Sequence, residues 1–223
     1  DSQLSVHLNG NEQSRGDVQA FDNVLRTELE ASFDNELRLF AEVATRYEAK
    51  DRLEPGKPKQ DSSSKINRRW LMSDDIELEL REFYIDGYVD TVFYRLGKQQ
   101  TVWGQSDGLQ VLDVVNPMRY REFVSDGIEN RRIPLWTANI EFPVREWMMQ
   151  VIWIPDQTYH LYPEPGSEYA ISSAKLTPII DGTQQVVLER EARPDRIVKD
   201  SDYGFRLTGF VGGWDIGLSY LYQ

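Results

Sequence analysis

Hydrophobic and polar residues alternate along much of the chain, and the alternation is clearest over residues 203–222. Before the turn Gly212-Gly213, every second residue from Tyr203 to Leu207 is apolar. After the turn, one face again carries the apolar residues Trp214, Ile216, Leu218, Tyr220 and Tyr222. A period of two with one apolar face indicates a β-strand whose two faces meet different surroundings. This segment therefore predicts a β-hairpin.

The same pattern predicts strands over residues 4–8, 21–33, 36–48, 75–85, 91–102, 133–142 and 147–154. Some of these are joined by short turns, at Asp34-Asn35, at Asp86-Gly87 and over 143–145. Others are separated by long polar loops, over residues 51–70, 104–132 and 155–202. Short turns and long loops that alternate along a chain are typical of outer-membrane barrels. We therefore predict a single all-β domain over residues 1–223, an antiparallel up-and-down transmembrane β-barrel.

The strand count predicts a barrel larger than these residues. About nine strands are expected, whereas single-chain bacterial barrels have an even number. A sheet with two free edges would expose unpaired backbone groups to lipid, which is costly. We expect residues 1–223 to be the N-terminal part of a larger barrel, incomplete on its C-terminal side.

Aromatic residues make up 12% of the chain, with six Trp and eleven Tyr. In membrane barrels such side chains gather at the two interfaces between lipid and water. The predicted interface girdle consists of aromatic residues near strand ends: Trp136, Trp147, Trp153, Tyr203 and Trp214. Trp147 and Trp153 share one strand and lie roughly 20 Å apart, comparable with an apolar band of about 25 Å crossed at a tilt.

If the apolar faces meet lipid, the opposite, charged faces line a lumen. The predicted lumen-lining, solute-contacting residues are Arg26, Glu28, Arg38, Glu42, Arg46, Glu77, Glu79, Arg81, Arg95 and Arg206. So many charges require water or paired partners, because a lone buried ion costs several kcal/mol. Rings of charge that select solutes and cross-strand ion pairs that stiffen the wall both fit this pattern.

The loop 104–132 is the predicted constriction, because long loops that fold inward narrow or plug a barrel. It contains an apolar stretch that water disfavours, so we expect it to pack against something. Its polar candidates are Asp113, Asn116, Arg119, Arg121 and Glu122. An external cap or a surface for a partner protein fits the same loop.

The amino-acid composition limits which ligands and activities are expected. The net charge of −12 argues against nucleic-acid binding. With no cysteine and two histidines, neither a metal site nor a cofactor is expected. Residues 104–108 match the Gly-x-Ser-x-Gly nucleophile elbow around Ser106, but that motif needs a strand, a helix and a downstream Asp and His. His160 is the only downstream histidine, and we predict that the protein is not an enzyme.

The segment Leu96-Gly97-Lys98-Gln99-Gln100-Thr101-Val102-Trp103-Gly104, followed by Asn116-Pro117 and by residues 132–136, resembles a known signature. It is similar to the "LGRQ…WG…NP" pattern of a large proteobacterial outer-membrane family that carries a domain-of-unknown-function label, with Lys98 where Arg is usual. The resemblance covers residues 75–223. It implies a porin-like barrel distantly similar to alginate-export-type channels. Its members often occur beside inner-membrane exporters of the resistance-nodulation-division class. The resemblance therefore also implies a role in moving hydrophobic or anionic compounds.

We therefore expect a channel in the bacterial outer membrane, part of a Gram-negative cell envelope, that lets a polar or amphipathic solute cross or leave. Its expected partners are outer-membrane lipid, a small-molecule solute, and an inner-membrane exporter system or other envelope proteins. The main alternative is a soluble periplasmic β-sandwich that binds carbohydrate or a protein partner, with the aromatic residues as core and stacking platforms. A third hypothesis is a barrel that conducts nothing and presents its loops to partners.

Overall fold

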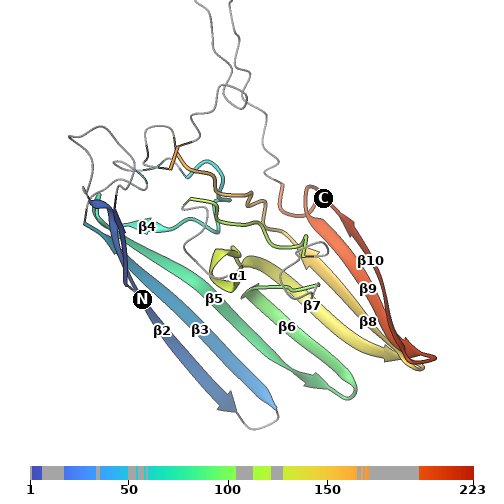
Figure 1. The fold of residues 1–223 in the computed structure, drawn as a ribbon. Helices are drawn as coiled ribbons and strands as arrows, with labels where there is room; N and C mark the ends of the chain where they lie inside the picture. The colour runs from blue at the N-terminus through green and yellow to red at the C-terminus, as the bar shows by residue number, and fades with distance from the viewer. Residues whose placement is uncertain are drawn as a thin grey trace, which may run out of the picture.

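The computed structural model describes residues 2–6, 18–33, 36–49, 54, 58, 60–103, 113–121, 128–164, 167, 169–170 and 196–223. These residues form an all-β structure built on one antiparallel meander of nine strands (Figure 1). The prediction of an antiparallel, up-and-down all-β chain is confirmed at this level.

Neighbours along the chain are neighbours in the sheet, apart from one short strand. The order is β1 (Ser2–Val6), β2 (Val18–Phe33), β3 (Leu37–Glu48), β5 (Ile76–Val89), β6 (Val92–Gln99), β7 (Leu135–Val144), β8 (Trp147–Ile154), β9 (Asp202–Val211) and β10 (Trp214–Tyr222). The two-residue strand β4 (Trp70–Leu71) pairs with β5 outside this path. The helix α1 (Ile128–Arg131) is a single turn. Among the described residues, no helix has the length and apolar character needed to cross a membrane.

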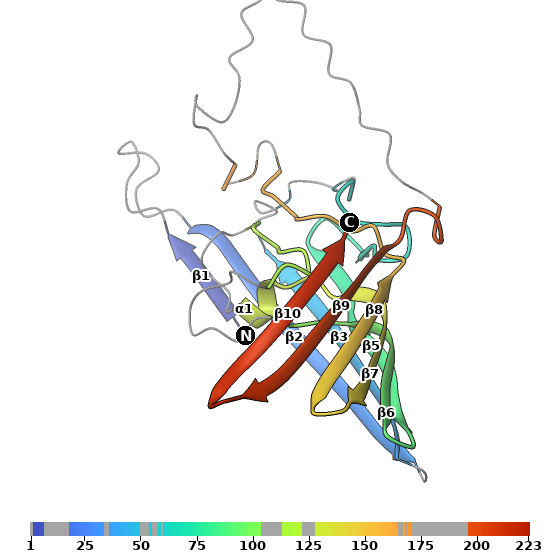
Figure 2. The ribbon, with the colours of Figure 1, turned by 90° about the vertical axis from the view of Figure 1, so that its right-hand side faces the viewer.

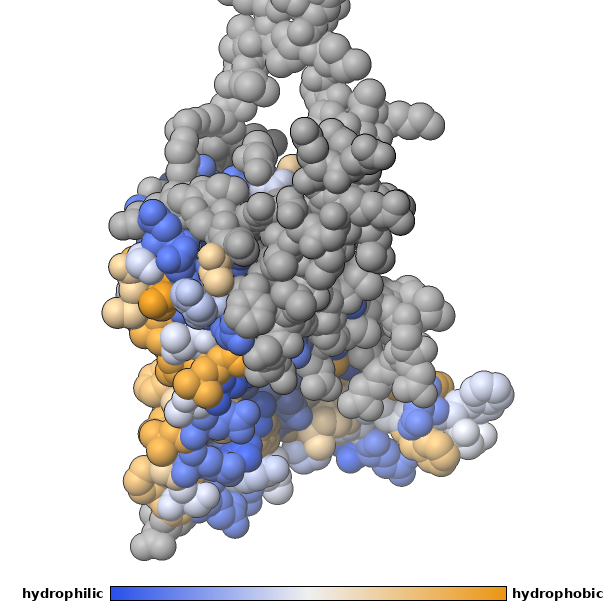
Figure 3. All heavy atoms as spheres, turned by 60° about the vertical axis from the view of Figure 1, so that its left-hand side comes forward, coloured by the Kyte–Doolittle hydropathy of each residue, from blue (hydrophilic) through white to orange (hydrophobic). Residues whose placement is uncertain are grey.

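The sheet is curved like a trough, and its two faces differ in chemistry (Figures 1 and 2). Large apolar side chains on the convex face remain exposed, for example Leu25 at 67%, Leu218 at 61% and Trp214 at 75%. Charged side chains on the concave face are buried, including Glu79, Arg81 and Asp86. The hydrophobic residues follow the outer edge of the sheet, with hydrophilic ones just inside it (Figure 3). The alternation in the sequence therefore gives the sheet an apolar convex face and a charged concave face.

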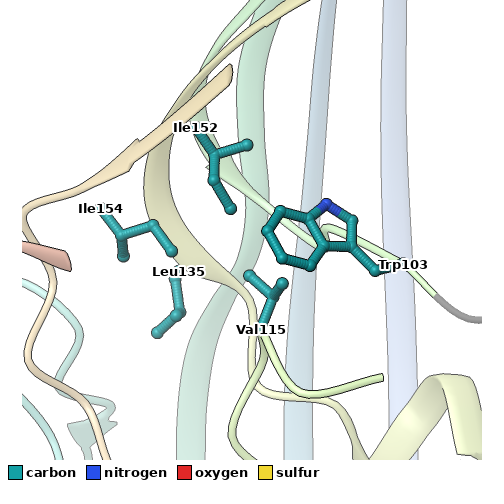
Figure 4. Close-up of a cluster of buried hydrophobic side chains, with 5 residues drawn as sticks. All are labelled: Trp103, Val115, Leu135, Ile152 and Ile154. Carbon is teal, nitrogen blue, oxygen red and sulfur yellow. The ribbon is translucent and has the colours of Figure 1, made fainter. Parts of the chain in front are cut away.

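Residues 113–121 and α1 lie on the concave side of the sheet, and the other described loop segments lie at the end of the sheet opposite the short turns. On the concave side, loop residues form a small hydrophobic core with the inward-facing ends of β7 and β8 (Figure 4). Its fully packed members are Trp103, Val115, Leu135, Ile152 and Ile154, with Leu221 of β10 beside them. The core is thus local, and most of the concave face is filled by polar contacts instead.

One predicted turn is wrong. Asp86-Gly87 does not end a strand, because β5 continues to Val89 and turns at Asp90, which has a φ of 57°. The strand continues because Asp86 to Val89 stay paired with β6, and it contains a β-bulge where the register between β3 and β5 shifts between Glu42 and Val43. The extra residue moves the apolar positions of β5 from even numbers to odd ones, so Asp86 faces the concave side. The turn predicted over 143–145 is present at the end of that range, because β7 includes Pro143 and the chain turns at Arg145, whose φ is 59°.

The predicted closed barrel is not formed by the described residues. β1 pairs only with β2, and β10 pairs only with β9, so both edges of the sheet are open. The hairpin at the end is as predicted, with Val211 paired to Trp214. Gly212 and Gly213 have φ values of 60° and 90°, which a two-residue turn between twisted strands requires. The described residues therefore form an open, strongly curved sheet.

Gly97 tests the packing of this wall. Its φ is +135°, and a Cβ there would lie 2.2 Å from the backbone oxygen of Phe83. We expect Gly97→Ala to lower the free energy of unfolding by at least about 2 kcal/mol, through backbone strain and the clash. Equilibrium unfolding in urea measures this change.

The matched control for this prediction is Gly217→Ala on β10. A Cβ at Gly217 meets nothing closer than Thr208 Cγ2 at 3.7 Å, and the residue has no positive φ. The control should unfold like the wild type. Equal stability of both variants would contradict the proposed role of Gly97.

Candidate functional site

The charged residues predicted to line a lumen all lie on the concave side of the sheet. Cross-strand partners share a face, and the ladder pairs Arg46 with Glu77, Glu28 with Glu42, and Gln150 with Arg206. The remaining members of the predicted set follow the same alternation or contact these residues: Arg26, Arg38, Glu79, Arg81 and Arg95. The structure thus gathers them on one surface.

The most buried charges form an ionic cluster at the loop-covered end of this face. Arg69 donates to both oxygens of Glu54, at 2.6 and 2.8 Å, and also pairs with Glu77 of β5. Arg121 pairs with the same two carboxylates, and its Nη1 lies 3.4 Å from Glu77 Oε1. Arg46 of β3 approaches Glu77 at 3.3 Å. Two loops and two strands are therefore tied together by buried ion pairs.

A second ion pair lies next to this cluster. Arg119 Nη2 donates to Glu79 Oε2 at 2.6 Å, and both side chains are at least nine-tenths buried. Arg81 lies 3.9 Å from Glu79 and 4.0 Å from Glu42. A buried pair of this kind adds little net stability, but removing one partner costs about 3–5 kcal/mol. Its effect is to fix the loop that carries Arg119 against β5.

Glu54 is the loop carboxylate at the centre of the ionic cluster. Burial raises the pKa of Glu54, but Arg121 and Arg69 lower it by more, and the pKa lies far below its ordinary value. Burial likewise lowers the pKa of Arg69, while Glu77 and Glu54 raise it by more, so it lies above its ordinary value. Each side chain therefore stays charged in this buried environment because its partner carries the opposite charge.

A row of polar side chains crosses the concave face nearer the short turns. Arg38 donates to both oxygens of Asp86, at 3.0 and 2.7 Å, and Arg95 donates twice to Asp86 Oδ2, at 3.0 and 2.7 Å. The guanidinium of Arg95 also lies 4.3 Å from the ring centroid of Tyr84, which stacks on Phe40. One carboxylate thus holds two arginines in fixed positions.

The row continues on β7 and β8 through amide groups. Gln150 donates to Asn139 Oδ1 at 3.0 Å and to Glu141 Oε1 at 3.2 Å, and it accepts a hydrogen bond from Trp103 Nε1 at 2.9 Å. Beside it, Arg38, Asp86, Arg95 and Glu141 border a hollow of about 640 Å³. A hollow with both signs of charge and aromatic walls is suited to polar or amphipathic molecules.

The signature segment of the sequence fastens the next loop to this wall. Gln99 donates to the backbone oxygen of Thr137 at 3.0 Å. The Asn116 side chain accepts from the backbone N–H of Thr101 at 2.7 Å and donates to the backbone oxygen of Ile133 at 3.0 Å. These bonds satisfy loop backbone groups that would otherwise be buried without partners. The loop is consequently part of the packed interior.

The described part of the predicted constriction loop, residues 113–121, lies on the concave face. Arg119 and Arg121 reach the wall as described, and Asp113 Oδ2 accepts from Arg132 at 2.7 and 2.6 Å. Of the loop's apolar stretch, Val115 is in the core, whereas Val114 is half exposed. Glu122 lies outside the described residues. The described segment does not form an external cap.

The predicted aromatic girdle falls on the convex face. Near the long loops, the indole of Trp136 donates to the backbone oxygen of Ile66 at 2.9 Å, and that of Trp153 donates to Ser201 Oγ at 2.8 Å. Tyr203 stacks on Tyr222 with ring centroids 4.9 Å apart. Trp147 and Trp214 lie beside the short turns at the other end.

Sequence reasoning missed several residues of this surface: Glu54, Arg69, Asp86, Trp103, Gln150 and Asp156. For Asp86 a signal existed, because the apolar positions of β5 change from even to odd numbers after residue 80. Glu54 and Arg69 stand in a polar loop, and nothing in their sequence context distinguishes them from solvated charges.

The described residues do not assemble a metal site. They contain no group of His, Asp and Glu placed to hold a metal ion. His160 Nδ1 accepts a hydrogen bond from the backbone N–H of Met118 at 2.8 Å, so it holds a loop in place. Ser106 lies outside the described residues.

The pKa of Glu54 predicts how acid affects the loops. Its folded-state pKa is depressed, so its stabilising contribution is present above its ordinary value of 4.5 and is lost as the pH falls below it. Unprotected amides exchange more slowly as the pH falls, so we expect the loss to appear as lower protection factors for residues 60–69 as the pH is lowered from about 5 toward about 3. In Glu54→Gln, the protection of residues 60–69 should be lower than in the wild type at neutral pH. It should also change less when the pH is lowered. An acid dependence identical in both proteins would contradict this role.

Comparison with known proteins assigns a family without an activity. No curated protein matches the sequence. The sequence pattern of the family described as "Protein of unknown function (DUF1302)" matches residues 15–222. That description names neither a porin nor an alginate-export channel, so the porin-like character stays a prediction. The signature residues that bind the loop to the wall all fall within the match, and the chain belongs to the DUF1302 family.

Proposed function

We propose that the protein is a channel of the bacterial outer membrane, whose curved sheet forms part of a barrel wall and whose lumen passes a polar or amphipathic solute. One observation carries the proposal. The apolar face of the sheet is convex and uncovered among the described residues, while the charged face is concave and buried under loops. Soluble proteins have the opposite arrangement, with apolar side chains inside.

The energetics of the convex face support a lipid environment. Exposed large apolar residues occur on strands from β2 to β10, and they include Leu29, Phe83, Ile140, Phe205 and Leu218. Monomeric soluble proteins rarely expose contiguous apolar patches larger than a few hundred Å². A β-sandwich would place a second sheet over this face, and no described segment lies there. Hydrocarbon is the simplest cover for such a surface.

A membrane location also requires that the sheet be closed. The free edges of β1 and β10 carry backbone groups that lipid cannot satisfy. We infer that further strands pair with both edges, from the same polypeptide or from a second copy. The outward-facing apolar band and inward-facing polar row then extend around the whole wall.

The lumen is proposed to be narrowed at the long-loop end and wider at the short-turn end. The ionic cluster of Glu54, Arg69 and Arg121 holds two loops across the passage at the first end. At the other end, the hollow of about 640 Å³ keeps Arg38, Arg95 and Glu141 accessible. Mixed charges and aromatic rings favour a polar or amphipathic solute. An inner-membrane exporter as partner remains a prediction from the resemblance.

The membrane location is tested by lysine substitutions on neighbouring residues of β10. Leu218→Lys places a charge on the convex face, and we expect it to destabilise the folded protein in membranes by about 2–4 kcal/mol. Ser219→Lys places the same charge on the concave face beside Arg206, where it should cost about 1 kcal/mol or less. Heat-modifiable gel mobility of protein recovered from outer membranes measures the folded fraction. Equal effects, or a wild type that stays monodisperse in buffer without detergent, would refute the location.

Conduction is tested by releasing the constriction loop. Asn116→Ala removes both side-chain bonds that hold the loop to residues 101 and 133. In planar bilayers we expect a single-channel conductance above that of the wild type, with more frequent transitions. Val114→Ala changes the exposed neighbour in the same loop and should leave the conductance unchanged. Negligible current for all three proteins would favour a barrel that only presents its loops to partners.

A further inference from the structure

A second hollow, of about 390 Å³, lies at the long-loop end of the wall, outside the proposed passage. It is bordered by the segment 61–68, by residues 155 and 157 after β8, and by residues 196–197 before β9. Three cations line it, Lys65, Arg68 and Arg196, against a single carboxylate, Asp61. The chain as a whole has a net charge of −12. This hollow is therefore a local cationic site on an acidic protein.

These cations are available for a ligand. Among the described residues, neither Lys65 nor Arg68 forms an ion pair, and both side chains are exposed. Arg196 has only a long contact, with its Nε 3.7 Å from Asp200, and its side chain is 66% exposed. In the ionic cluster, by contrast, arginines are buried against carboxylates. Two exposed cations without an ion pair, beside a third with one long ion pair, favour an anion in the hollow, and phosphate is a strong acceptor for them.

The position of the hollow indicates which anion. The backbone oxygen of Ile66, on its rim, accepts the indole N–H of Trp136, whose side chain belongs to the convex face. Trp153 of the convex face donates to Ser201 Oγ, which in turn donates to the backbone oxygen of Val198, the residue after Ile197. Ile66 and Ile197 are themselves exposed, at 47% and 57%. The hollow thus combines three cations with two exposed isoleucines, and Trp136 of the convex face is hydrogen-bonded to its rim at Ile66.

We propose that this hollow binds the phosphate-bearing headgroup of a membrane lipid whose acyl chains lie along the convex face. The proposal rests on the membrane location argued above. Tryptophan side chains favour the headgroup level of a bilayer, and basic residues beside them meet lipid phosphates. A free phosphate ion would gain nothing from the exposed Ile66 and Ile197 or from the neighbouring indoles. A lipid contacts both the charged and the apolar part of the site.

The test uses the full-length protein purified in a non-ionic detergent. Native mass spectrometry measures the affinity for dioleoyl phosphatidylglycerol, and dioleoylglycerol serves as the lipid without phosphate. The test variant is Lys65→Gln with Arg68→Gln. The control is Arg145→Gln, which removes an exposed cation from the turn between β7 and β8, at the other end of the sheet. Near an anionic lipid each cation contributes about fivefold in affinity, so we expect the test variant to bind the phospholipid about thirtyfold more weakly.

Under the proposal, the control variant binds like the wild type, dioleoylglycerol binds weakly, and millimolar inorganic phosphate does not displace the phospholipid. Equal affinities of the test variant and the control would overturn the proposal. Displacement by inorganic phosphate would also overturn it and would identify a site for small anions. A failure of the membrane location shows separately, as wild-type protein that needs no detergent, and it would remove both proposals.

Discussion

Pairing of buried charge is the constraint on which the arrangement of this protein depends. The concave face carries arginines and glutamates on adjacent strands, and loops cover much of it. Each charge removed from water costs several kcal/mol unless an opposite charge and hydrogen bonds replace its hydration. Glu77 meets that requirement through arginines from one strand and two loops, namely Arg46, Arg69 and Arg121. The buried charges on the strands therefore determine where the charged loop residues lie.

Backbone groups of the loops impose the same requirement. Asp156 illustrates the solution, since its Oδ1 accepts from Ser64 Oγ at 2.6 Å and from Thr158 Oγ1 at 2.7 Å. Its Oδ2 accepts from Asn67 Nδ2 at 2.8 Å and from the backbone N–H of Trp136 at 3.1 Å. One buried carboxylate thereby joins two loops to the start of β7. Together with the ion pairs, such contacts fix the described loop segments against the strands.

The two faces of the sheet then have complementary roles in the proposed function. Charged and amide groups on the concave side hold the loops and leave a hollow near the short turns. Apolar and aromatic side chains on the convex side find no protein cover among the described residues. At the long-loop end of that face, Trp136 and Trp153 adjoin a cationic hollow. A wall between hydrocarbon and a wet lumen accounts for all three features with a single orientation.

The sequence by itself determined the strands, the hairpin at Gly212-Gly213 and the division of charged and apolar residues between two faces. A period-two pattern and short turn motifs are local signals, so they can be read from neighbouring residues. The turn assigned to Asp86 failed because the strand continues through it, paired with β6, and a bulge that depends on pairing with β3 moves it to the concave face.

Only the tertiary structure decided which loop charges matter and how the wall is filled. Glu54 and Arg69 belong to one loop and Arg121 to another, and the paired members are 15 and 67 positions apart in the sequence. No periodicity links such distant positions, since their meeting depends on the curvature of the sheet and on the desolvation cost of each charge. The open edges of β1 and β10 are likewise a property of strand pairing in space, which the alternation along each strand does not encode.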